Sequence, residues 1–158
     1  MPSFESTRRV RFSDQQMFDL VADVEKYPLF LPLCESLVVK SRSPKDDGEE
    51  LIATMGIGYK AIRESFTTRV LVQRPGRLIL VEYLDGPFRH LENRWRFLEA
   101  SGGSDVHFFI DYEFRSPILS VLMGAVFDKA FRKFAEAFEE RAAHVYAGVP
   151  QAARISPV

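Results

Sequence analysis

Few residues in this sequence have the types and spacing that metal binding or catalysis requires. The three histidines, His90, His107 and His144, are scattered along the chain and lack the spacing of metal ligands. The single cysteine, Cys34, has no activating partner near it in the sequence, which favours a small buried apolar role over a nucleophile. We therefore expect no metal site and no catalytic residue.

Glu64 stands out among the carboxylates because it alternates with apolar residues of an extended segment. Thr68 and the apolar residues Ile62, Phe66 and Val70 share its parity, so its side chain is predicted to face an interior cavity. An inward carboxylate requires a charged or hydrogen-bonding partner. An ion pair with an arginine of an adjacent strand is favoured over a polar contact with a ligand. Acid–base catalysis on a small molecule would have only Glu64 and Tyr112 to supply its groups, and is disfavoured.

Residues 55–61, with the sequence MGIGYKA, match the glycine pattern of dinucleotide-binding sites. Such a site requires a helix to begin at the glycines. Here Ile62, Phe66 and Val70 continue at the even spacing of a strand. The glycines therefore indicate a bend or bulge in a sheet.

A small basic cluster, Arg89, His90, Arg94 and Arg96, is interleaved with aromatic residues. Alternation directs Arg94 and Arg96 outward and Trp95 inward. A solvated strand face explains this pattern, and a docking patch for phosphate groups of lipid head groups or RNA is the alternative.

The composition sets limits on the class of protein. The chain has 158 residues with a formal net charge of −1, and its fourteen Phe outnumber five Tyr and one Trp. The length suits one domain, and the charge gives no basic field for nucleic acid, so no DNA partner is expected. We expect no secretory leader, and no apolar run reaches the roughly 18–20 residues that a membrane span requires. We expect a cytoplasmic protein, with peripheral contact to the inner membrane as an open alternative.

The periodicity predicts a strand, two short helices, six further strands and one long helix, in that order. Short turns between the strands indicate that sequential strands pair antiparallel. A sheet of this length must curl, and the terminal helix is the element long enough to cover its apolar face. The expected fold class is α+β: a curved antiparallel sheet of about seven strands wrapped around a long C-terminal helix, the helix-grip arrangement. The strands are expected at residues 4–12, 37–43, 51–57, 59–72, 78–84, 91–97 and 106–114.

The predicted terminal helix, from residue 117 to about residue 147, is the most informative element. Phe127, Phe131, Phe134 and Phe138 form one stripe at helical spacing, typical of a core-facing side. The first part, residues 118–127, is apolar nearly all round. Such a segment must be buried or face a lipid, a ligand or a partner.

Residues 18–34 carry the pattern by which the chain resembles a known family. The run VADVEKYPLFLPLC at residues 21–34 is similar to the signature V-x-D-V-E-x-Y-P-x-F-L-P-x-C of the coenzyme Q-binding START-domain proteins. These proteins belong to the polyketide cyclase/dehydrase-like superfamily, whose bacterial branch includes ribosome association toxins. Further similarity lies at GPF (residues 86–88), WRF (residues 95–97) and DYEF (residues 111–114).

The resemblance implies a START-like lipid-binding domain at residues 1–147. The lack of periodicity after it predicts a disordered tail at residues 148–158. The resemblance also implies a hydrophobic tunnel that binds ubiquinone or a related polyprenyl lipid without catalysis, requires no cofactor, and supports respiratory electron transfer and quinone biosynthesis. A regulator that binds a ribosomal subunit and inhibits subunit association is the alternative. The expected ligand contacts are Phe66, Trp95, Tyr112, Leu122, Met123, Phe127, Phe131 and Glu64. The expected docking residues are Ile118, Leu119, Arg89, Arg94 and Arg96.

Overall fold

Seven antiparallel strands form one sheet in the computed structural model, which describes residues 3–147. Their order in the sheet is β1-β7-β6-β5-β4-β3-β2, so consecutive strands are neighbours except for β1, which pairs with the last strand. The predicted pairing of sequential strands is confirmed. The strands are β1 (Ser3–Val10), β2 (Cys34–Lys45), β3 (Gly48–Tyr59), β4 (Ile62–Gln73), β5 (Leu78–Asp85), β6 (Phe88–Ala100) and β7 (Gly103–Phe114).

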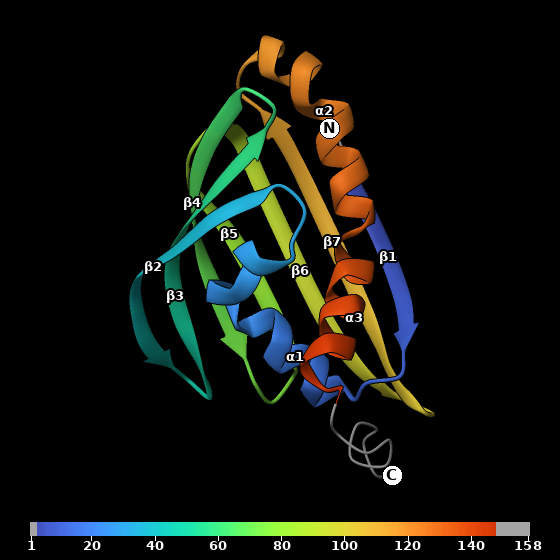
Figure 1. Cartoon of the computed structure of the whole chain (residues 1–158). Coiled ribbons are helices and arrows are strands. Elements are labelled where there is room, and N and C mark those ends of the chain that lie inside the picture. Colours follow the sequence, from blue (N-terminus) through green and yellow to red (C-terminus); the bar gives the residue numbers. More distant parts are fainter. Residues whose placement is uncertain (1–2, 148–158) are drawn as a thin grey trace.

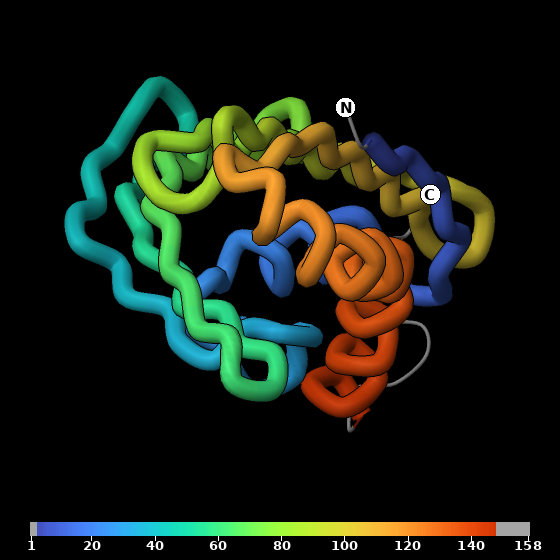
Figure 2. The backbone as a smooth tube through the Cα atoms, turned by 90° about the horizontal axis from the view of Figure 1, so that it is seen from above, coloured from blue at the N-terminus to red at the C-terminus, as the bar shows by residue number. Residues whose placement is uncertain are grey.

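Alternating side chains decide which face of the sheet is covered. Along β7, Val106, Phe108, Ile110, Tyr112 and Phe114 are all buried, whereas the residues between them are partly exposed. This period of two is the signature of a strand with one face on the core. The sheet therefore has one inner, aromatic face, which its curvature turns toward the helices (Figures 1 and 2).

The two short helices follow β1 as predicted. Helix α1 (Asp14–Ala22) begins with a capping box, in which Ser13 Oγ accepts from the Gln16 backbone N–H and the Gln16 side chain accepts from the Ser13 backbone N–H. A 3₁₀ helix, η1 (Val24–Leu29), contains Pro28 and leads into β2. These elements fill one end of the concave side of the sheet (Figure 1).

The long terminal helix is interrupted, which corrects the prediction of a single helix. It consists of α2 (Pro117–Arg132) and α3 (Phe134–Val145), with Lys133 between them. The Lys133 backbone N–H donates to the Ala130 carbonyl oxygen at 3.0 Å, three residues back, so the chain is tightened at this point. The tightening leaves Phe131 and Phe134 in edge contact, with ring centroids 5.2 Å apart.

The glycine-rich segment is part of the sheet, as expected. Gly56 and Gly58 belong to β3, and the chain turns at Lys60 and Ala61 into β4. A register shift lies on the neighbouring strand between Cys34 and Ser36, so the irregularity falls on β2. A Cβ at Gly58 would come within 2.3 Å of the Glu35 carboxyl group, so the glycine leaves room for that side chain to lie across β3.

The helices close the concave side of the sheet. Seen from above, the sheet curls around α2 and α3 (Figure 2). Residue 147 is the last that the structure describes, so the predicted tail at residues 148–158 lies outside the described residues. None of the helices within residues 3–147 combines the length and the hydropathy that a membrane span requires.

Candidate functional site

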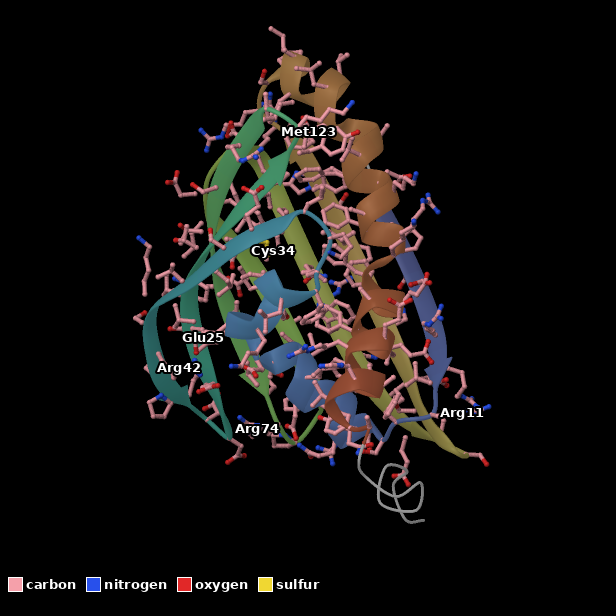
Figure 3. The ribbon with its side chains drawn as sticks, viewed as in Figure 1. Arg11, Glu25, Cys34, Arg42, Arg74 and Met123 are labelled. Carbon is pink, nitrogen blue, oxygen red and sulfur yellow. The ribbon has the colours of Figure 1, made fainter. Side chains whose placement is uncertain are left out.

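An apolar cavity lies between the inner face of the sheet and the helices. Strands β2 to β7 supply its floor, while η1, the loop after it, α2 and α3 supply its roof. Side chains fill most of the space between these layers (Figure 3). The lining residues are Val24, Tyr27, Leu31, Pro32, Leu33, Leu37, Ala53, Met55, Ile57, Phe66, Thr68, Val70, Val81, Leu91, Asn93, Trp95, Ile110, Phe127, Phe131, Phe134 and Phe138.

The cavity is small in this conformation. Measured as the space open to the centre of a water molecule, its volume is about 90 Å³. Small-molecule pockets usually measure about 300–1,000 Å³, so this space is several-fold smaller. A molecule with a ring and an isoprenoid chain would therefore have to move side chains or helices apart to enter.

The polar groups of the cavity are few, and two of them form hydrogen bonds within residues 3–147. The Tyr27 hydroxyl donates to the Val21 carbonyl oxygen at 2.5 Å, and burial raises the pKa of Tyr27. Asn93 Nδ2 donates to the Phe109 carbonyl oxygen at 2.8 Å. Thr68 is only 7% exposed, and its hydroxyl makes no hydrogen bond to any residue that the structure describes. The lining within residues 3–147 contains no carboxylate, histidine, lysine, arginine or cysteine.

Aromatic rings form the end of the site near α2. Phe88 stacks on Phe114 at 4.9 Å, and Phe114 contacts Phe127 at 5.1 Å. Tyr112 lies beside Phe131, with centroids 5.1 Å apart. The Tyr112 hydroxyl is buried without a hydrogen-bond partner among the described residues, and burial raises its pKa to about 12.

The structure brings four of the predicted ligand contacts together at the cavity: Phe66, Trp95, Phe127 and Phe131. Tyr112 and Met123 are buried behind this lining and do not reach the cavity surface. Met123 lies in the first half of α2 (Figure 3). Leu122 is 55% exposed and faces away from the core.

Glu64 does not reach the apolar cavity. It lines a shallow depression with Arg63, Ser65, Gly86 and Pro87 near the start of β4. The prediction that Glu64 pairs with an arginine of a neighbouring strand is wrong within residues 3–147. The strand register places the apolar residue Ile57 opposite Glu64.

The basic cluster is accompanied by carboxylates on the outer face of the sheet. Arg89 pairs with Glu113 at 2.9 Å, and Arg94 pairs with Glu92 at 2.6 Å. The Arg94 guanidinium also lies 4.3 Å from the centre of the Phe109 ring. Arg96 is exposed, and the described part of the chain gives it no ion pair. The local positive charge is therefore smaller than the sequence indicates.

The start of α2 presents an apolar tip to solvent. Ile118 is 71% exposed and Val121 is 82% exposed, whereas Leu119 packs against the core. This end of the helix projects beyond the sheet (Figure 1). We call Ile118, Val121 and Leu122 the apolar tip. The sequence predicted an unusual apolar segment here, but only the structure shows which side of it is uncovered.

Sequence reasoning missed several residues of the site. The loop residues Leu31, Pro32 and Leu33 line the cavity but have no periodicity that would direct them inward. Thr68 and Asn93 carried a usable signal, because each stands among apolar residues of the same parity on its strand.

Comparison with known proteins gives the same architecture. A family model described as polyketide cyclase/dehydrase and lipid transport matches residues 10–139. The chain belongs to this polyketide cyclase/dehydrase and lipid transport family. The START-like identification made from the sequence motifs is thereby confirmed.

Two named proteins are similar to this chain over most of its length. A protein of Rickettsia prowazekii named ribosome association toxin RatA is 34% identical over 148 residues, which cover 92% of this chain and 99% of that protein. The mitochondrial coenzyme Q-binding protein COQ10 homolog B of Xenopus laevis is 32% identical over 148 residues, which cover 90% of this chain and 59% of that protein.

Solved structures of other proteins share the helix-grip fold. An 18 kDa protein of Caulobacter crescentus is 31% identical, with a TM-score of 0.77 and coverage of 93% of this chain and 99% of that one. A START superfamily protein of Mycobacterium smegmatis is 17% identical, with a TM-score of 0.74 and coverage of 90% and 98%. A Streptomyces aromatase/cyclase is 16% identical, with a TM-score of 0.78 and coverage of 94% and 98%. The last two likenesses show the fold alone.

Proposed function

We propose that this protein is a non-enzymatic binding protein for a polyprenyl quinone, ubiquinone or a close relative, that supports respiratory electron transfer and quinone biosynthesis. The observation that carries the proposal is the cavity between sheet and helices, whose lining is apolar apart from a few hydroxyl, indole and amide groups. Pockets of this kind favour ligands with large apolar surface. The similarity to a protein named for coenzyme Q binding supports the same class of ligand.

The lining also favours binding over catalysis. Acid–base chemistry needs a titratable group within hydrogen-bonding reach of the reacting atom. Tyr27 is the titratable residue on the described lining, and its hydroxyl is already bonded to the Val21 carbonyl oxygen. Glu64 lies outside the cavity. A bound ligand is therefore expected to leave the protein unchanged.

Lipid extraction tests this function. Purified protein is extracted with solvent and the extract is analysed by mass spectrometry, and protein stripped of lipid is incubated with vesicles that contain ubiquinone. We expect quinone in the extract, or uptake from the vesicles. Protein that carries no quinone and takes none up would contradict the proposal.

A cavity-filling variant tests whether quinone uptake depends on the cavity. Val81 faces the cavity from β5, so Val81→Phe should reduce quinone uptake several-fold. Leu84→Phe makes a similar change on the outer face of the same strand, where Leu84 is exposed, and should leave uptake unchanged. Equal uptake by both variants would show that the quinone does not bind in the cavity.

We further propose that the apolar tip contacts the cytoplasmic face of the inner membrane. A quinone resides in the bilayer, so its binding protein must meet a lipid surface, and the tip lies about two helical turns from the lining residue Phe127. The double substitution Val121→Ser and Leu122→Ser should abolish flotation with vesicles. Leu98→Ser, which removes an exposed leucine from β6, is the matched control. Unchanged flotation of the double variant would refute the tip contact.

A ribosome-binding regulator is the second candidate function. The observation that favours it is the name of the Rickettsia relative, which this chain matches over nearly the full length of both proteins. The outer face of β6 is the candidate surface, although Arg89 and Arg94 there already pair with carboxylates. Co-sedimentation with ribosomal subunits at moderate salt decides between the functions. Arg94→Glu with Arg96→Glu should abolish binding, and absence of binding by the unaltered protein would reject this candidate.

A further inference from the structure

Two polar side chains interrupt the apolar floor of the cavity. Asn93 lies on β6 between Val81 of β5 and Ile110 of β7, which the strand register places on either side of it. Thr68 lies on β4 between Ala53 of β3 and Tyr83 of β5. Both face the cavity. Burying a polar group away from water costs free energy unless a hydrogen bond compensates it, so polar residues at these positions require a reason.

The Thr68 hydroxyl has no hydrogen-bond partner in the described part of the fold. The residue is buried, and its hydroxyl oxygen bonds to nothing within residues 3–147. The adjacent Thr67 points to the other face of β4 and is satisfied, because its hydroxyl lies 2.7 Å from that of Thr54. Valine would fill the space of Thr68 equally well. The hydroxyl is thus available to a molecule in the cavity.

The Asn93 amide is oriented by the backbone of β7. Its Nδ2 donates to the Phe109 carbonyl oxygen at 2.8 Å, which assigns the nitrogen to that branch of the amide. The Oδ1 atom lies on the other branch and accepts no hydrogen bond from the described residues. The fold therefore holds a hydrogen-bond acceptor in place on the cavity floor.

We propose that Thr68 and Asn93 form a hydrogen-bonding subsite that recognises the ring oxygens of the bound lipid. Thr68 Oγ1 donates to a carbonyl or methoxy oxygen of the quinone ring, and the second N–H of Asn93 Nδ2 donates to another ring oxygen. In the reduced ring, Asn93 Oδ1 accepts from a hydroxyl. The subsite makes the cavity select a polyprenyl chain with an oxygenated ring over a pure hydrocarbon of similar length. This inference rests on the proposed lipid-binding function and adds the residues that read the head group.

Binding of two probes tests the subsite: a ubiquinone with five isoprene units, and squalene, a hydrocarbon of similar length that has no oxygen. The unaltered protein should bind the quinone more tightly. Because a neutral hydrogen bond changes affinity by about 3–10-fold, Thr68→Val and Asn93→Leu should each weaken quinone binding by about that factor and leave squalene binding unchanged or tighter. Thr67→Val, the same chemical change on the opposite face of β4, should alter neither.

The outcomes distinguish failure of the subsite from failure of the proposed lipid-binding function. If the unaltered protein binds neither probe, the lipid-binding function itself is refuted. If it binds the quinone but both variants bind it equally well, the function stands and the subsite is wrong. If Asn93→Leu fails to fold, since the Phe109 carbonyl oxygen loses its donor, Thr68→Val decides alone, because the fold makes no use of that hydroxyl.

Discussion

Phe138 shows how a single residue joins three elements. It is 0% exposed, and its ring contacts Tyr27 at 5.3 Å, Phe30 at 5.1 Å and Trp95 at 5.0 Å, each in edge geometry. Edge contacts of this kind stabilise an aromatic pair beyond the area that it buries. Phe138 therefore holds the segment after α1 against both α3 and the sheet, and so maintains the roof of the cavity.

Substitution of Phe138 should have a large effect on stability. Phe138→Ala removes a fully buried ring and leaves a void, so we expect the free energy of unfolding to fall by about 3–5 kcal/mol. Urea unfolding followed by far-ultraviolet circular dichroism measures the change. Val145→Ala, at an exposed position of the same helix, should change stability by less than about 0.5 kcal/mol. A loss below about 1 kcal/mol for Phe138→Ala would show that the site collapses around the void.

Cys34 illustrates how burial controls reactivity. The thiol is buried, it donates to the Ser36 carbonyl oxygen at 3.6 Å, and burial raises its pKa to about 11. At pH 8 the thiolate fraction is then about a hundredfold below that of an exposed cysteine. Alkylation by iodoacetamide, followed by intact mass, should be slow at pH 8 and should accelerate as pH rises toward the raised pKa. Fast alkylation at pH 8 in the folded protein would contradict this prediction.

At the scale of elements, the start of α1 follows directly from the sequence. Ser13 and Gln16 form a reciprocal capping box with two 3.0 Å hydrogen bonds. Ser13 is also buried, so water cannot replace its hydroxyl. Hydrogen bonds of this kind join residues only three positions apart, so the sequence pattern alone indicates where the helix begins.

Removal of the cap should destabilise the fold modestly. Ser13→Ala leaves the Gln16 backbone N–H unsatisfied, and we expect a loss of about 1 kcal/mol in the free energy of unfolding. Thermal or urea unfolding measures it. Ser13→Asp retains an acceptor at the cap and serves as the comparison. Equal stability of the Ala variant and the unaltered protein would mean that another group caps the helix.

The break between α2 and α3 could not be predicted from the sequence. No proline or glycine marks Lys133, and the aromatic stripe continues across it. The tightened turn depends on packing, because Phe131 and Phe134 face the same cavity wall together with Phe127 and Phe138. Local propensity favours a continuous helix, and the tertiary contacts override it.

At the scale of the whole molecule, the proposed ligand should stabilise the folded state. The cavity between sheet and helices is underfilled, and a molecule that binds only the folded state stabilises it by mass action. At a free ligand concentration about a hundred times Kd the gain is about 2.7 kcal/mol. For a domain of this size that corresponds to a rise in Tm of about 5–10 °C.

Differential scanning fluorimetry with a two-isoprene ubiquinone measures this rise. Val81→Phe, which fills the cavity, should show little ligand-dependent rise, and Leu84→Phe should respond like the unaltered protein. A ligand that binds but leaves Tm unchanged would indicate equal affinity for the unfolded chain, and would contradict a site built by the fold.

Much of this protein is determined by the sequence itself, because strand and helix periodicities are local. Alternation correctly directed Trp95 inward and Arg94 outward, and helical spacing identified the stripe from Phe127 to Phe138 as core-facing. The helix-grip arrangement also followed, since the order of elements leaves few ways to cover one apolar face, and the resemblance of residues 21–34 implied its START-like class.

Only the tertiary structure decided which residues meet. The pairing of β1 with β7 and the register that places Ile57 opposite Glu64 depend on contacts between distant segments. The curvature of the sheet and the packing of the helices set the volume of the cavity, and they bring Thr68 and Asn93 to one floor and the tip to the surface. Local patterns specify which face a side chain takes, whereas long-range pairing and packing specify what it faces.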